Sequence, residues 1–240
     1  MAISTVLPRS KGVSPIGAEF IQQLSRQPLA KRLVTTAASP RSQPGRSITI
    51  GVMGRTHDAS ASHLAEAFEL GRAIGINGCT LITGACSGMP LEAAKGAQHE
   101  GALVVGISPG LSLVEHISKY DSPVHHHDVL VFTGAGLMGR EVINISSSEM
   151  VVIAGGHAGT LGELAIAYVE GKIIGVLSGV GGVSKIAREV LRVCHKNSGA
   201  RALYDSDPHR LVARMLSAYR ARAAAQSAGL PIDSDALVRH

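Results

Sequence analysis

The stretch VVIAGGHAGTLGELAIA, residues 151–167, sets four glycines, a histidine, a threonine and a glutamate between two apolar runs. The run before the glycines is typical of a buried strand, and the segment after Thr160 has the periodicity of a helix. The first N–H groups of a helix have no partner within it, and together with the helix dipole they attract an anion. The stretch therefore predicts a strand, a glycine turn and a helix, and the turn either only bends the chain or holds a phosphate.

The same order of apolar run, glycine turn and helical segment recurs on both sides of this stretch. Strands are expected at residues 47–54, 79–85, 103–109, 129–134, 150–156 and 173–179, and helices at residues 59–78, 87–101, 136–149, 160–171 and 183–196. Strands that are apolar throughout, rather than in alternation, are buried on both faces. We therefore expect an α/β fold, a Rossmann-like doubly wound parallel sheet with helices on both faces in a single domain.

The two ends of the chain differ in composition from this body. Residues 1–46 carry seven Lys or Arg and one Glu, and are expected to form a basic, partly flexible extension with a candidate short helix at 17–34. Residues 47–200 are expected to form a Rossmann-like domain that binds a nucleotide or phosphate, and residues 201–240 a C-terminal helix and tail. Aromatic side chains for base stacking are not interleaved with the basic residues, so nucleic acid is not expected as a partner.

Composition limits the classes to which the chain can belong. No apolar run approaches the roughly 18 residues of a membrane-spanning helix, and residues 1–12 lack the apolar centre of a signal peptide. The three cysteines have no paired spacing, which argues against a disulfide framework or a zinc site. Consecutive side chains at His125, His126 and His127 splay apart, so we expect a solvated loop there rather than a metal site. A cytoplasmic protein without a membrane partner is the expectation.

Ligands of open parallel sheets bind beyond the carboxyl ends of the strands, where the glycine turns lie. The turns near residues 54, 84, 134 and 155 are therefore expected to meet at one edge of the sheet. Cys86 precedes a predicted helix, whose N-terminus lowers the pKa of a thiol, but a small packed thiol is the interpretation that we favour. The residues expected to contact a phosphate or nucleotide are Gly54, Arg55, Gly84, Ala85, Cys86, Ser87, Gly134, Gly155, Gly156, His157, Ala158, Gly159 and Thr160.

GGHAGTLGE, residues 155–163, resembles the PGGxGTxxE motif of the LONELY GUY (LOG) family and of its wider superfamily, which includes molybdenum cofactor carrier proteins. Arg140 lies fifteen residues before the first position of the motif, which is the spacing of a functional arginine in the LOG pattern. Residues 81–110 and 51–56 resemble other glycine-turn segments of the same fold. The likeness extends over residues 47–180 and implies a Rossmann-like fold and a homodimer.

Several residues depart from the LOG pattern. The leading proline of the motif is Gly155 here, and the glycine at its third position is His157. LOG enzymes carry two adjacent acids after the threonine, whereas here the first is Gly162 and only Glu163 remains. The MHxRK signature around the arginine is absent, and Glu149 stands where an aspartate is common. These departures favour the cofactor-carrier branch over a cytokinin-activating enzyme.

Two functions stay open on the sequence. The resemblance implies hydrolysis of the N-glycosidic bond of a nucleoside 5′-monophosphate, which releases a free base and ribose 5-phosphate and requires no cofactor. Arg140 and Glu163 are then catalytic: Glu163, kept ionised by the helix dipole, orients water or contacts the ribose, and Arg140 offsets phosphate charge. The alternative is a non-catalytic carrier or nucleotide sensor that holds a small phosphorylated ligand, with the molybdenum cofactor as a candidate. A purely structural Arg140–Glu163 ion pair is the third interpretation.

Overall fold

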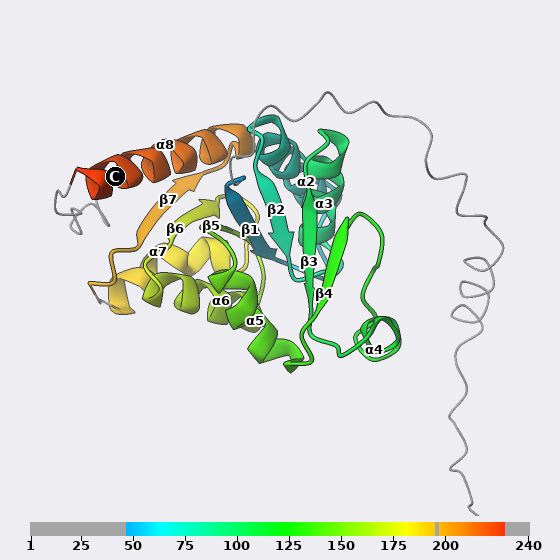
Figure 1. Ribbon diagram of the computed structural model, residues 1–240. Helices are drawn as coiled ribbons and strands as arrows, with labels where there is room; N and C mark the ends of the chain where they lie inside the picture. The colour runs from blue at the N-terminus through cyan, green and yellow to red at the C-terminus, as the bar shows by residue number, and fades with distance from the viewer. Residues whose placement is uncertain (1–46, 195–196, 229–240) are drawn as a thin grey trace, which may run out of the picture. The chain divides into compact units, whose positions relative to one another are not determined.

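The computed structural model describes residues 47–194 and 197–228. Its strands are β1 (Thr49–Gly54), β2 (Thr80–Thr83), β3 (Val104–Ser108), β4 (Val129–Phe132), β5 (Met150–Ala154), β6 (Ile173–Leu177) and β7 (Arg201–Asp205). They form one parallel sheet in the order β4-β3-β2-β1-β5-β6-β7 (Figure 1). The expected Rossmann-like α/β fold is therefore confirmed.

Helices connect the strands and cover both faces of the sheet. They are α2 (Ala61–Ile76), α3 (Met89–His99), α4 (Leu113–Ser118), α5 (Gly136–Ser146), α6 (Ala158–Val169), α7 (Val183–Cys194) and α8 (Pro208–Ser227). Helices α2, α3 and α8 lie on one face, and α5, α6 and α7 lie on the other (Figure 1). Each layer has its own apolar core, the first around Leu70 and Met215 and the second around Ile145 and Leu164. Over the two described ranges, no helix is long and apolar enough to cross a membrane.

The direction in which successive strands are added to the sheet reverses between β4 and β5. Strands β2, β3 and β4 are added outward on one side of β1, and β5 then pairs with β1 on the other side. Such a reversal leaves a crevice at the carboxyl ends of the two strands that flank it, here β1 and β5. The topology thus fixes where a ligand site can form.

Helices α2 and α3 approach each other closely through two glycines. A Cβ on Gly71 would overlap the carbonyl oxygen of Ala93, and a Cβ on Gly96 would overlap the carbonyl oxygen of Phe68. Both obstacles are backbone atoms, so no change of rotamer makes room for a side chain. The two glycines therefore set the distance between α2 and α3, which both pack on β2.

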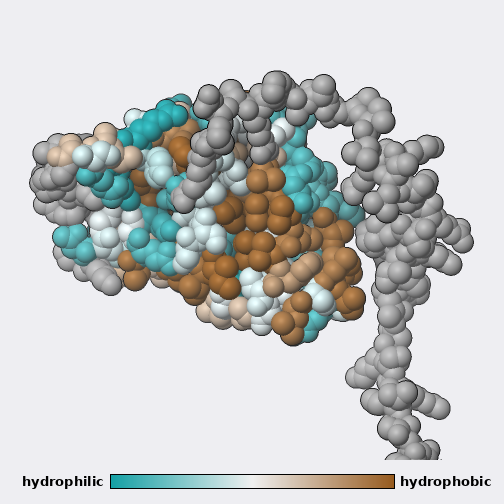
Figure 2. All heavy atoms as spheres, in the orientation of Figure 1, coloured by the Kyte–Doolittle hydropathy of each residue, from teal (hydrophilic) through white to brown (hydrophobic). Residues whose placement is uncertain are grey.

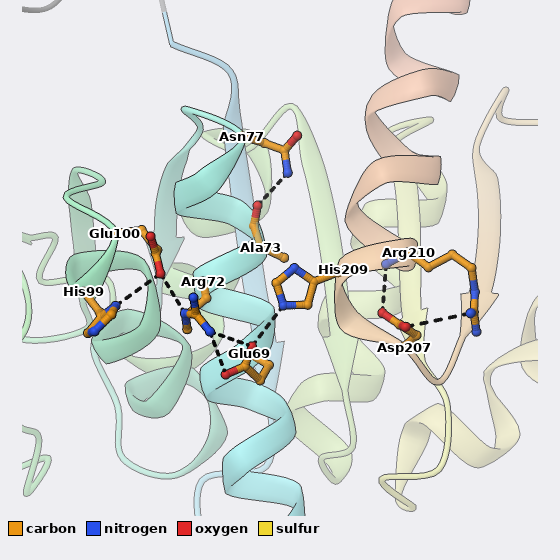
Figure 3. A network of polar contacts seen from close by, with 9 residues as sticks. All are labelled: Glu69, Arg72, Ala73, Asn77, His99, Glu100, Asp207, His209 and Arg210. Carbon is orange, nitrogen blue, oxygen red and sulfur yellow. Dashed lines mark hydrogen bonds and ion pairs between the residues drawn. The ribbon is translucent and has the colours of Figure 1, made fainter.

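A polar network joins α2, the end of α3 and the start of α8 on this face of the sheet (Figure 3). Arg72 donates to Glu100 at 2.7 Å and to Glu69 at 3.3 Å. His209 Nε2 lies 3.0 Å from Glu69 Oε2 and brings α8 into the network. These side chains are partly exposed to water, so the network orients the three helices more than it stabilises them.

Two elements differ from the sequence prediction. Residues 113–118 form the short helix α4 inside an expected loop, and residues 201–205 form β7 at the edge of the sheet. Only Leu203 and Asp205 are buried in β7, so this strand has no continuous apolar run by which it could be recognised. The sheet therefore extends past residue 200, and the expected C-terminal helix is α8, which packs on β6 and β7. The candidate helix at 17–34 lies outside the described residues, as do both expected tails.

A structural carboxylate lies at the end of the sheet where the strands begin, opposite the crevice. Glu149, which replaces the aspartate of the LOG pattern, accepts a hydrogen bond from the Thr49 N–H at 2.8 Å. It also accepts one from the Tyr219 hydroxyl at 2.7 Å. Glu149 therefore ties the start of β1 to α8.

Candidate functional site

A cavity of about 130 Å³ lies at the carboxyl ends of β1, β2 and β5, where the strand order reverses. We call it the crevice. Its walls come from the ends of these strands, from α5 and from the first turns of α6. The residues that line it are Val52, Met53, Gly54, Arg55, Thr56, Gly84, Cys86, Pro90, Arg140, Glu141, His157, Gly159, Thr160 and Glu163.

Most of the residues expected from the sequence line the crevice. They are Gly54, Arg55, Gly84, Cys86, Arg140, His157, Gly159, Thr160 and Glu163. Ala85, Ser87, Gly156 and Ala158 are next to lining residues in the chain, and Gly155 is two residues from His157, but none of the five lines the crevice itself. Gly134 lies apart, against Leu111, because β4 is separated from β1 by two strands. Three of the four glycine turns therefore meet at the crevice.

The first two glycines of the motif hold the turn in place. Gly155 donates its N–H to the Ser184 hydroxyl at 2.8 Å, and Val183 donates its N–H to the Gly156 carbonyl at 3.1 Å. Both glycines have positive φ angles, 70° and 87°, which a residue with a Cβ adopts only with strain. The turn is thus fixed to the start of α7, which leaves the first turn of α6 to receive an anion.

Arg140 is buried in the crevice with 8% of its surface exposed, and its guanidinium packs on the backbone of Gly84. A Cβ on Gly84 would overlap Nη1, so the turn after β2 needs glycine in order to admit this side chain. Arg140 Nε is buried without a hydrogen-bond partner. The Arg140 charge acts on Glu163 through space. A buried cation with unused donors is suited to a ligand phosphate or carboxylate.

Glu163 lies one turn into α6 and is 7% exposed. Burial raises the pKa of its carboxyl from 4.5 to about 7; the Arg140 guanidinium opposes this shift, the Glu141 charge adds to it, and a hydrogen bond from Thr160 opposes it. Glu163 was expected from the sequence to stay ionised beside the helix dipole, but its carboxyl changes protonation near neutral pH. Such a carboxyl can accept or donate a proton during a reaction.

Glu141 lines the crevice, although the sequence analysis did not single it out. It is 6% exposed, burial raises its pKa, and its Oε2 is buried without a hydrogen-bond partner. Arg140 and Asn144 are buried beside it, so α5 turns its polar residues towards the sheet. Its outer face is apolar and exposed, at Leu137, Met138 and Val142. This reversal of the usual amphipathic pattern was the sequence signal for Glu141.

Cys86 and His157 differ from each other in what they offer a ligand. Burial raises the pKa of the Cys86 thiol to about 11, which fits the favoured packed thiol and contradicts the lowered pKa that a helix N-terminus would give. Helix α3 begins only at Met89, three residues further on, and the thiol is protonated at neutral pH. His157 is exposed at the start of α6 and its side chain makes no capping hydrogen bond, which leaves the ring available.

The consecutive histidines have separate partners. His126 Nδ1 lies 2.9 Å from Gln98 Oε1, and His127 Nε2 lies 3.0 Å from Thr83 Oγ1. Burial lowers the pKa of His127 to about 4, so this ring is neutral, and it is not in a solvated loop as expected. The part of the chain that the structure describes holds no group of three or more His, Cys, Asp or Glu that could bind a metal ion.

A second cavity, of about 390 Å³, lies at the start of α7 and was not expected from the sequence. It is lined by Ser178, Gly179, Gly181, Ser184, Lys185, Arg188 and Tyr204. The Arg188 guanidinium lies 4.2 Å from the centroid of the Tyr204 ring. Arg55 of the crevice approaches this cavity, since a Cβ on Gly181 would lie 3.4 Å from its Nη2. The two cavities are therefore neighbours at one edge of the sheet.

Comparison with known proteins finds relatives over most of the described chain. The model of the SLOG cluster4 family matches residues 47–212. An uncharacterized protein of Archaeoglobus fulgidus is 34% identical over 128 residues, which are 53% of this chain and 78% of that protein. The family match therefore includes the crevice and every strand of the sheet.

Two solved structures are similar in sequence and in fold. The molybdenum cofactor binding protein of the phototrophic bacterium Rippkaea orientalis is 28% identical with a TM-score of 0.61, over 72% of this chain and 98% of that one. The molybdenum cofactor carrier protein of Chlamydomonas reinhardtii is 29% identical with a TM-score of 0.56, over 72% and 99% of the two chains. Both alignments thus take in nearly all of the other protein.

Proposed function

Because the chain belongs to the SLOG cluster4 family, in the Rossmann-like superfamily of the LOG and molybdenum cofactor carrier proteins, we propose that its crevice binds a phosphate-bearing nucleotide or pterin. The phosphate lies at the first turn of α6. The cations of Arg140 and Arg55 offset its charge, and the rest of the ligand extends towards the mouth of the crevice.

The buried guanidinium of Arg140, whose Nε has no hydrogen-bond partner, is the observation that carries this proposal. It lines the same cavity as Gly159 and Thr160 at the start of α6. A buried cation and a helix N-terminus both favour an anion, and the oxygens of one phosphate can satisfy both. Arg55 supports the same conclusion, because its Nε is also buried without a partner.

The molybdenum cofactor, a pterin with a phosphate, fits these residues in charge and in hydrogen bonding. Arg140 and the first turn of α6 suit the phosphate, and the polar walls suit the pterin ring. The crevice, at about 130 Å³, is smaller than the roughly 300–1,000 Å³ of sites that enclose a whole drug-sized ligand. It therefore encloses the phosphate and the group next to it. In a carrier the cofactor is cargo, so this chain binds and shields it and takes no part in its redox chemistry.

Replacing Thr160 by valine is expected to weaken the binding of AMP and GMP by about tenfold, the size of a lost hydrogen bond to a charged group. Thr160 is 5% exposed, and its hydroxyl, which donates to Glu163 in the free protein, turns to the phosphate on binding; the similarly shaped valine fills the same space but presents a methyl group. Isothermal titration calorimetry on the wild type and the variant measures the two dissociation constants.

Thr80→Val is the matched control for this measurement. Thr80 is 7% exposed and lies at the start of β2, at the opposite end of the strand from the crevice. Its replacement is expected to leave nucleotide binding unchanged. A wild type that binds neither nucleotide, and that releases no pterin to mass spectrometry when it is unfolded, contradicts the proposal.

Hydrolysis of the N-glycosidic bond is the second candidate function, and the pKa of Glu163 near neutrality favours it. Water adds to C1′ of the sugar and the ionised Glu163 accepts a proton from that water, while the base departs with the electrons of the broken C1′–N bond and takes up a proton from solvent. Chromatography of free base after incubation with AMP and GMP separates the two functions. Release by the wild type but not by Glu163→Gln assigns a phosphoribohydrolase, and tight binding without release assigns a carrier or sensor.

The chain also has a surface suited to homodimer formation, on edge strand β4 and the outer face of α5. Exposed apolar side chains gather there (Figure 2), at Val129, Val131, Phe132, Leu137, Met138 and Val142. Apolar patches of this kind mark interaction sites. A second copy of the chain is the partner that the LOG resemblance implies, and a two-fold pair buries the same patch from both subunits.

Light scattering on the purified wild type is expected to give twice the chain mass of 24.8 kDa. The double variant Met138→Glu/Val142→Glu is expected to be a monomer, because both charges are then buried in the interface. Val193→Glu is the control, since Val193 is also apolar and 67% exposed but lies on α7. A monomeric wild type, or a double variant that still forms dimers, contradicts this interface.

A further inference from the structure

Glu141 brings a second carboxylate into the crevice from a different helix than Glu163. Its side chain comes from α5 and lies against α6. A Cβ on Gly159 would lie 3.0 Å from Glu141 Oε1, and a Cβ on Gly162 would lie 3.3 Å from Oε2. The two glycines lie on one face of α6, three residues apart, and together they make room for this carboxylate.

The space beside Gly162 explains why α6 carries no second acid. A glutamate at position 162 would enter the space of the Glu141 carboxylate and place two like charges together in a buried site, which is unfavourable. An acid at 162 would therefore have to displace the Glu141 carboxylate and would be repelled by it. The crevice retains two carboxylates, and the second is supplied by α5.

Nothing in the described protein accounts for the burial of Glu141. Its Oε2 has no hydrogen-bond partner, and neither has the Nε of the adjacent Arg140. Burying a carboxylate without partners is costly, and the attraction of Arg140 only partly offsets the effect of burial on the Glu141 pKa. Hydrogen-bond donors of a ligand would complete the missing contacts, as expected for an otherwise unsatisfied buried group.

We propose that Glu141 is a ligand-binding residue which, with Glu163, accepts hydrogen bonds from a pair of adjacent donors and so selects among phosphate-bearing ligands. The inference rests on the proposed function. Such paired donors occur in two parts of these ligands: the vicinal hydroxyls of a ribose, and the ring N–H and amino group of the 2-amino-4-oxopyrimidine that guanine and pterins share. A carboxylate can bind either pair through its two oxygens.

Nucleotide pairs that differ by one donor identify the group that Glu141 binds. AMP is compared with 2′-deoxy-AMP, and GMP with IMP, by calorimetry at pH 8. In one of the two pairs the wild type is expected to bind the nucleotide with the extra donor, AMP or GMP, about tenfold more tightly, which is the size of a hydrogen bond to a charged group. Glu141→Gln keeps the shape of the side chain but removes its charge and one acceptor, and is expected to reduce that preference to about twofold or less.

Moving the carboxylate to α6 gives a second, independent variant. Glu141→Ala alone is expected to lose the preference, and the double variant Glu141→Ala/Gly162→Glu is expected to recover it in part. Gly162→Glu alone crowds two acids into one space and is expected to bind more weakly than the wild type. Circular dichroism of each variant establishes that it is folded before binding is compared.

The outcomes separate this inference from the proposed function. The inference is overturned if Glu141→Gln binds with the affinity and the preference of the wild type, or if the wild type shows no preference in either pair. If Thr160→Val still weakens binding in that case, the proposed function stands. Where a pterin co-purifies with the wild type, its loss from Glu141→Gln supports the inference and its full retention overturns it. If no nucleotide binds and no pterin co-purifies, both fail together.

Discussion

Replacing Gly96 by alanine is expected to lower the free energy of unfolding by about 3 kcal/mol, the upper range for overpacking. In an exposed helix the same change stabilises the protein by about 1 kcal/mol, because alanine is the better helix former. Here the added methyl group overlaps the Phe68 carbonyl oxygen across the contact of α2 and α3. The sign of the effect therefore reports helix packing rather than helix propensity.

Urea denaturation followed by circular dichroism measures this loss, and Gly101→Ala is its control. Gly101 follows the same helix with a φ of 74°, and no atom lies within 4 Å of a Cβ built there. Its replacement is expected to cost only the roughly 1–2 kcal/mol of a left-handed alanine. Equal losses at both positions would mean that α2 and α3 separate easily.

Glu163→Gln is expected to raise the free energy of unfolding by about 3 kcal/mol at pH 8 and by less than about 1 kcal/mol at pH 5. The unfolded chain loses the Glu163 proton near pH 4.5, whereas burial in the folded protein holds it to about pH 7. The folded state therefore binds more protons across this interval, and the wild type loses stability as the pH rises through it. Glutamine has no proton to lose and avoids that cost.

Urea titrations of both proteins at the two pH values measure the difference, and Glu189→Gln is the control. The Glu189 carboxyl is exposed on α7, and a hydrogen bond from Arg192 lowers its pKa. Its replacement is therefore not expected to stabilise the protein at either pH. If Glu163→Gln is less stable than the wild type at pH 8, Arg140 stabilises the ionised carboxyl by more than burial destabilises it, which contradicts the raised pKa.

The fold was predictable from the sequence wherever burial is complete. Strands β1, β2, β3, β5 and β6 are buried on both faces, so each appears as a short apolar run. Strand β7 has a half-buried face and a single buried apolar residue, Leu203, which is too little pattern to identify an edge strand. Helix α4 has only six residues, which is less than two turns of periodicity.

The sequence could predict only those parts of the candidate site that lie at the ends of adjacent strands. The turns after β1, β2 and β5 meet because these strands are adjacent. Gly134 follows the edge strand β4. Its turn resembles the other three in sequence but lies away from the crevice. Glu141 escaped notice because its role depends on the packing of α5 against α6, in particular on the room left by Gly159 and Gly162.

The attachment of the glycine turn to α7 has a consequence for the rate of ligand exchange. The hydrogen bonds of Gly155 with Ser184 and of Gly156 with Val183 already hold the turn in shape. If the crevice binds a phosphate as proposed, its capture orders little backbone, so little loop entropy is lost and no slow rearrangement is expected before binding. The proposed complex is therefore expected to have a lifetime governed by escape of the ligand from the crevice, and substitutions in the walls are expected to act mainly on dissociation.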